Sequence, residues 1–188
     1  QVRHIENADI DFDQLDYMNN LCRYVCSHTP DEEELQKKYQ EVKNRPPQHP
    51  AAKYFAGVMG GTGFAVFFGC NFKDAIVAVI VSLMIVVVGK WLEKREGNLF
   101  VYNTILSFLS EVIIVLSVRN GFADHPERIM IGIVMLLISG LSTTNGIREI
   151  LQKDYISGFI NIMNSILGAA GIAVGTALAM LVLNDFSA

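Results

Sequence analysis

A single carboxylic acid stands in the middle of a long apolar segment of this chain. Glu111 is flanked by leucine, valine, isoleucine, phenylalanine and serine over residues 106–115. An ionised carboxylate that faces lipid is costly, so this side chain is expected to face the interior of a helix bundle, a cavity or a partner. There it could couple the movement of a proton or another cation to transport. As a neutral acid it could instead hydrogen-bond neighbouring helices, and the residues alone leave both roles open.

Three more polar side chains share a helical face with this acid. Asn103, Ser107, Ser110 and Glu111 are spaced i, i+4, i+7 and i+8, which places them on one side of a helix. The spacing predicts a polar path along this helix.

A second polar cluster covers the end of the fourth apolar segment and the start of the fifth. Almost every position from 139 to 146 is small or polar, and Gly140 and Gly146 weaken a regular helix there. Broken helices at membrane depth expose backbone groups that can bind ions or carboxylates, whereas a capped helix end is the plainer alternative. Arg148 could meet an anionic substrate or anchor the helix at the interface. The candidate substrate-binding residues are Thr143, Thr144, Asn145, Arg148, Asn161, Asn164 and Ser165. Asn161 and Asn164 could instead hydrogen-bond a neighbouring helix.

Glycines recur at helical spacing in the first and fifth apolar segments. Small residues four apart let helix backbones approach closely in lipid, so these glycines are assigned to helix packing. They are Gly57, Gly61, Gly168, Gly171 and Gly175.

Motifs for catalysis and for metal binding are missing from the sequence. Cys22, Cys26 and His28 do not have the spacing of a standard zinc site. There is no Gly-Lys-Ser/Thr phosphate loop, no nucleophile elbow and no His-Glu-x-x-His. We therefore expect neither an enzyme nor a metal or cofactor.

Composition places most of the chain in a membrane. Half of the residues (51%) are hydrophobic and 18% are charged, and half of the charged residues fall within the first 53 positions. The net charge of -4 argues against a nucleic-acid partner. Each apolar segment approaches or exceeds the roughly 20 residues that cross a bilayer. The segments are 53–70, 75–92, 99–118, 129–147 and 157–183.

The predicted fold is therefore an all-α polytopic membrane protein with two parts. Residues 1–50 form a short cytoplasmic helical arm, the end of a soluble region that begins before Gln1, and residues 51–188 form a domain of five transmembrane helices. Most lysines and arginines fall on the side of the arm, which places the N-terminus in the cytoplasm and the C-terminus outside the cell (inner) membrane. Lys73 and Asp74 are expected to form a solvated pair that caps the second span.

The order of these features resembles the N-terminal module of the threonine/serine exporter (ThrE-type) family. The resemblance lies in residues 10–15 (IDFDQL), 67–74 (FFGCNFKD), 142–149 (STTNGIRE) and 154–158 (DYISG). The last two are similar to the family's Thr-Asn-x-x-Arg-Asp and Asp-x-x-Ser-Gly stretches. Cys70 stands where the family has glycine, and Glu149 stands where it has aspartate.

The resemblance implies secondary export of small amino acids such as threonine or serine, or of a dicarboxylate such as succinate. It also implies the split form of the family, which needs a second small membrane subunit, because the chain stops soon after Leu183. A homo-oligomer is a further possibility for the assembly. The absence of an ATP site favours transport driven by the proton-motive force. A non-transporting assembly subunit and a passive channel are the alternatives.

Overall fold

All the secondary structure that we can describe is helical. The computed structural model describes residues 12–45, 50–93, 95–138 and 140–185, and these residues form eight α-helices and no strand. This agrees with the predicted all-α class. The chain divides into two compact units, Gln1–Pro50 and Ala51–Ala188.

The first unit contains helices α1 (Phe12–His28) and α2 (Glu32–Lys43), which pack on each other. α2 begins where the side chain of Asp31 accepts a hydrogen bond from the backbone N–H of Glu32 at 2.9 Å. Three acids follow in the first turn of α2 and a lysine ends it, as the helix dipole favours.

Contacts from one tyrosine join the two helices of this unit. The hydroxyl of Tyr24 donates a hydrogen bond to Glu34 Oε1 at 2.8 Å, and Lys38 Nζ lies 3.2 Å from the centre of the Tyr24 ring. Lys38 is also 3.5 Å from Glu34. The hydrogen bond from Tyr24, together with Lys38, lowers the pKa of the exposed Glu34 carboxyl from its usual value of 4.5.

The second unit contains six helices, whose bounds follow the apolar segments of the sequence. They are α3 (Pro50–Phe67), α4 (Phe72–Glu93), α5 (Leu99–Arg119), α6 (Pro126–Leu137), α7 (Gly140–Leu151) and α8 (Tyr155–Asp185). Two of the turns use glycine in the left-handed region, at Gly69 (φ 89°) and Gly121 (φ 75°), where a side chain would be strained.

Three of these helices are long and apolar enough to cross a membrane, namely α4, α5 and α8. α6 and α7 meet this test only as a pair, which is bent by 52° and is either one broken span or a re-entrant loop. The apolar stretch of α3, Tyr54–Phe67, is shorter than a full span. By length and composition, the described residues therefore contain three candidate spans, or four if the bent pair counts as one span. The sequence predicted five.

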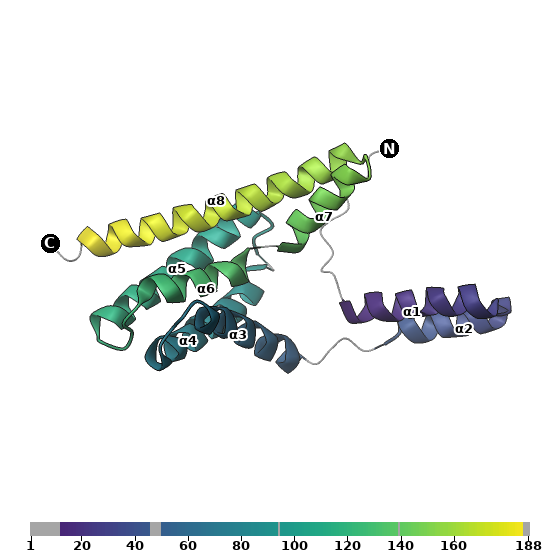
Figure 1. Cartoon of the computed structure of the whole chain (residues 1–188), viewed down its shortest axis with the longest axis horizontal. Coiled ribbons are helices and arrows are strands. Elements are labelled where there is room, and N and C mark those ends of the chain that lie inside the picture. The colour runs from purple at the N-terminus through teal and green to yellow at the C-terminus, as the bar shows by residue number, and fades with distance from the viewer. Residues whose placement is uncertain (1–11, 46–49, 94, 139, 186–188) are drawn as a thin grey trace. The chain divides into compact units, whose positions relative to one another are not determined.

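Helices α5 and α8 run parallel and side by side along much of their length (Figure 1). A methyl group on Gly171 would lie 2.5 Å from the carbonyl oxygen of Phe100, and one on Gly175 would meet the hydroxyl of Ser107. Thr104 Oγ1 also donates to the carbonyl of Gly171 at 3.1 Å. The small residues of α8 thus let the two backbones approach closely, as expected for helices in lipid.

Buried aliphatic side chains of α4, α5 and α6 form the core of this unit, and α3 packs against α4 in an antiparallel manner. Gly57 of α3 lies against Val86 of α4, and Gly61 lies one turn further along against Ser82. The largest fully buried aliphatic side chains are Leu106, Ile114, Ile129, Ile133 and Val81.

Asp74 differs from the expectation of a solvated loop pair. Its side chain is fully buried and accepts hydrogen bonds from the backbone N–H groups of Asn71 (3.1 Å), Asp124 (2.8 Å) and His125 (3.2 Å). His125 Nδ1 lies 3.0 Å from its second oxygen. Lys73 instead approaches Asp124 at 3.9 Å. The backbone N–H groups at the start of a helix have no carbonyl partner within the helix. The oxygens of Asp74 accept hydrogen bonds from such groups, and so the aspartate joins the start of α4 to the start of α6.

Candidate functional site

Helices α7 and α8 form a tight hairpin that positions most of the predicted substrate-binding residues. Gly146 and Gly158 face each other, and a methyl group on Gly158 would lie 2.7 Å from the carbonyl oxygen of Gly146. The turn between the helices holds Lys153 in the left-handed region, with φ at 70°. Only glycines let the two backbones come this close. A methyl group on Gly146 would also lie 3.2 Å from Cβ of Asn161, so Asn161 lies directly beside α7.

The contact made there joins Asn161 of α8 to Glu149 of α7. The amide nitrogen of Asn161 donates a hydrogen bond to Glu149 Oε2 at 2.7 Å, and both side chains are half-buried. A carboxylate acceptor makes this a charge-assisted bond, which is stronger than a bond between neutral groups. The bond fixes the orientation of the Glu149 carboxylate at the end of α7.

A small polar pocket lies beside this carboxylate. Its volume is about 270 Å³, and its lining consists of one cation, one anion and two amides. The four residues are Asn145, Arg148, Glu149 and Gln152. Two of them, Asn145 and Arg148, are predicted substrate-binding residues, and the structure brings them together on successive turns of α7.

The other predicted substrate-binding residues do not line this pocket. Thr144 Oγ1 donates to the carbonyl of Gly140 at 2.9 Å, and Ser165 Oγ donates to that of Asn161 at 3.0 Å. Both hydroxyls bond one helical turn back along their own helix. Thr143 is half-buried and Asn164 is exposed.

Glu111 lies in the interior of the second unit and is 3% exposed. Its Oε2 is buried, and no residue in the described parts of the chain donates a hydrogen bond to it. α5 packs against α4, α6 and α8. The central stretches of those helices, 75–89, 129–137 and 156–184, contain no Asp, Glu, Lys, Arg or His. The acid therefore has neither a hydrogen-bond donor at Oε2 nor a counter-charge facing it from these stretches.

The three polar residues predicted to share a path with Glu111 are buried, but each is bound to backbone. Asn103 Nδ2 donates to the carbonyl of Gly168 on α8 at 3.0 Å. Ser110 Oγ donates to that of Leu106 at 2.7 Å, and Ser107 Oγ to that of Thr104 at 3.2 Å. Of the four residues, Glu111 is the one that keeps a buried polar atom without a partner among the described residues.

The sequence interpretation missed four polar residues that the structure singles out. Glu149 and Gln152 line the polar pocket. Thr62 Oγ1 and Ser82 Oγ are buried and receive no partner from the described residues. Glu149 could have been found from its position three residues before Gln152 and next to Arg148, one helical turn after Asn145. Ser82 carried a weaker signal, because a lone serine in an apolar helix is usually satisfied by its own backbone.

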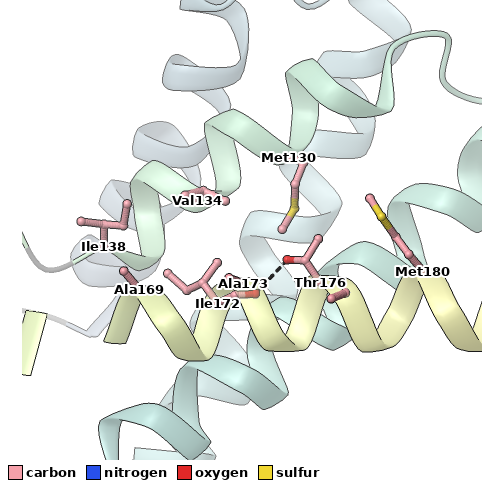
Figure 2. A pocket seen from close by; sticks show the side chains of 9 residues that line it. Met130, Val134, Ile138, Ala169, Ile172, Ala173, Thr176 and Met180 are labelled. Carbon is pink, nitrogen blue, oxygen red and sulfur yellow. Dashed lines mark hydrogen bonds between the residues drawn. The ribbon is translucent and has the colours of Figure 1, made fainter. Parts of the chain in front are cut away.

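A larger pocket of about 430 Å³ lies between α6 and α8 (Figure 2). Met130, Val134 and Ile138 form its α6 side, and alanines and Met180 cover much of the α8 side. The hydroxyl of Thr176 is bonded to the carbonyl of Ile172 at 2.9 Å. This pocket has no charged group that could recognise the ammonium or carboxylate of an amino acid, so the polar pocket is the better substrate site.

The model of a family described as "Putative threonine/serine exporter" (ThrE) matches residues 1–183. No curated protein and no solved structure matches the chain.

Proposed function

The chain belongs to the threonine/serine exporter family, and on that premise we propose that it is a subunit of a proton-driven secondary exporter. The family is one of transporters. The long apolar helices of this chain indicate an integral membrane protein. The proposed substrates are small amino acids such as threonine and serine, or a dicarboxylate such as succinate. The substrate enters from the cytoplasm through the pocket at the α7–α8 hairpin.

The observation that carries the proton coupling is the carboxyl group of Glu111. It is 3% exposed, and its Oε2 has no donor among the described residues. A buried carboxylate without a counter-charge is unstable, and the group gains stability by taking up a proton. A group that must be protonated in one conformation and can release its proton in another is what a proton-coupled transporter requires.

Substrate binding is proposed at the residues gathered on α7 and at the start of α8. Arg148 and Asn145 line the polar pocket and can bind a carboxylate, because a guanidinium pairs with both carboxylate oxygens. Thr143, Thr144, Asn164 and Ser165 lie on adjoining turns of the same two helices. They are proposed to contact the substrate as it moves past the hairpin.

The proposed topology counts the short α3 as a fifth crossing, with the N-terminal arm in the cytoplasm and the C-terminus outside. Its support is the excess of Lys and Arg on the side of the arm. The parallel packing of α5 and α8 fits this order of crossings. Two parallel spans need one crossing in the opposite direction between them, and α6 with α7 is proposed to supply it. A second small membrane subunit is proposed to pair with it in inverted orientation, as in many secondary transporters, and a homo-oligomer is the further possibility for the assembly.

The test is transport by the full chain in proteoliposomes, with its partner subunit where one is required. Labelled threonine, serine and succinate are offered with and without an imposed pH gradient. Wild-type protein is expected to transport at least one of them faster when the gradient is imposed. Glu111→Gln is expected to lose this response, because the amide cannot exchange a proton.

Glu127→Gln is the matched control, since it makes the same chemical change at an exposed position in the first turn of α6. It is expected to keep the response to the gradient. Transport that ignores the pH gradient in wild-type protein would identify a passive channel. No transport of any solute by a correctly assembled complex would identify a non-transporting subunit.

A further inference from the structure

The pocket at the α7–α8 hairpin carries one fixed charge of each sign. Arg148 supplies a guanidinium and Glu149 a carboxylate, while Asn145 and Gln152 add neutral amides. Its volume of about 270 Å³ is just below the range of roughly 300–1,000 Å³ for drug-sized ligands. The pocket therefore suits a molecule of a few heavy atoms.

The two charges are free to bind a ligand. No carboxylate of the described residues lies within 4.0 Å of the Arg148 guanidinium, and no cation of those residues lies within 4.0 Å of the Glu149 carboxylate. Arg148 and Glu149 are adjacent in the sequence, so their side chains leave the helix about 100° apart. This angle separates the two charges around the pocket.

Asn161 orients the anionic side of the pocket. Its amide holds Glu149 Oε2 at 2.7 Å, and no described residue donates to Oε1. One oxygen is thus fixed to α8, while the other can accept hydrogen bonds from a bound group. The close approach at Gly146 and Gly158 brings Asn161 to this place, so the arrangement is built by the hairpin.

We propose that Glu149, positioned by Asn161, is the ammonium-binding residue of this pocket, with Arg148 binding the carboxylate of the same substrate. This inference rests on the proposed function, because it takes the pocket to be the substrate site of the exporter. The arrangement selects a zwitterion, whose two charges each find the opposite charge. A dicarboxylate would place one of its two negative charges beside Glu149, and like charges at this distance disfavour binding.

The experiment measures competition for a labelled amino acid on the full chain in lipid nanodiscs, with its partner subunit where one is required. The three probes are L-threonine, 3-hydroxybutyrate, which lacks the ammonium group, and succinate. Wild-type protein is expected to bind threonine most tightly of the three. Glu149→Gln removes the charge that pairs with the ammonium group of threonine. This change is expected to weaken threonine binding by about 10- to 100-fold. The same change should alter 3-hydroxybutyrate binding by less than about threefold, because this ligand does not use Glu149.

Two further variants separate a binding role from a structural one. Glu149→Asp retains the charge and is expected to keep the preference for threonine over 3-hydroxybutyrate. Asn161→Leu is expected to reduce that preference, and to add little when combined with Glu149→Gln, because both changes act on the same contact. Glu96→Gln, in the exposed loop before α5, serves as the control and is expected to leave all three affinities unchanged.

Two results would overturn the assignment. One is a wild-type protein that prefers succinate to threonine, and the other is an equal loss of threonine and 3-hydroxybutyrate binding in Glu149→Gln. Either can occur while proton-coupled transport persists, which leaves the exporter function standing. If the zwitterion preference and its loss in Glu149→Gln are observed but the complex transports nothing, the proposed function fails and the assignment of Glu149 stands.

Discussion

The side-chain amide of Asn103 on α5 donates a hydrogen bond to the backbone carbonyl of Gly168 on α8 at 3.0 Å. This bond joins residues 65 positions apart in the chain. Gly168 has no side chain to cover its carbonyl, so the amide of a facing helix can reach it. The polar face of α5 is therefore largely a helix-packing surface, and Glu111 is the exception within it.

Substitution of Asn103 separates packing from transport. Asn103→Ala removes the bond to Gly168 and is expected to lower the free energy of unfolding by about 0.6 kcal/mol, the average for hydrogen bonds between membrane helices, and by no more than about 1.7 kcal/mol. The response of transport to a pH gradient should persist, unlike in Glu111→Gln. Unfolding in detergent and transport in proteoliposomes measure the two effects. Asn120→Ala removes an exposed bond within one helix and is expected to change stability by less than about 0.5 kcal/mol.

Gly171 is expected to be one of the glycines of α8 that cannot accept a side chain, together with Gly175. In Gly171→Ala the new methyl group would lie 2.5 Å from the carbonyl oxygen of Phe100, and backbone cannot move aside as a flexible side chain can. Overpacking of this kind destabilises by about 1–3 kcal/mol. Gly63→Ala provides the matched control, because nothing lies within 4 Å of a methyl group there. Thermal unfolding in detergent measures the difference. Equal unfolding midpoints for the two variants would contradict the close packing of α5 and α8.

The buried carboxylate of Asp74 is expected to be one of the most sensitive positions for stability. Asp74→Ala leaves the backbone N–H groups of Asn71, Asp124 and His125 without their acceptor. Removing one partner of a buried charged network costs about 3–5 kcal/mol. Lys73→Ala, at a side chain that is 62% exposed, should cost no more than about 1 kcal/mol. The thermal midpoints of both variants in detergent check the contrast, and equal midpoints would argue against it.

The contact between α1 and α2 is expected to weaken in acid. Hydrogen bonding from Tyr24 lowers the pKa of Glu34, so the folded arm holds the proton less tightly than the unfolded chain does. The stability that this carboxylate contributes is present above its unfolded pKa and is lost as the pH falls through the folded pKa. Carbon-13 NMR of the Glu34 carboxyl during an acid titration measures the effect. In Tyr24→Phe the pKa should move up toward 4.5, and an unchanged titration would show that the hydroxyl is not its cause.

Several features of this protein could be predicted from the sequence, because they depend on local patterns. Long apolar segments can only be helices in lipid, so the helices that contain residues 75–92, 99–118 and 157–183 follow from composition alone. The spacing of Asn103, Ser107, Ser110 and Glu111 put all four on one helix face, and all four are buried. The short α3 escaped this reasoning, because hydropathy does not report where a helix ends. The helix expected to weaken at Gly140 does bend there, between α6 and α7, whereas Gly146 lies within the regular α7.

The tertiary structure alone decided which polar groups have partners. Asn103 reaches Gly168, Asp74 reaches His125 and Asn161 reaches Glu149, and each pair is far apart in the sequence. Hydrogen bonds act over about 3 Å, whereas sequence periodicity fixes only the side of a helix on which a residue lies. The role of Glu149 in the polar pocket and the isolation of Glu111 Oε2 therefore became visible only once the helices were packed.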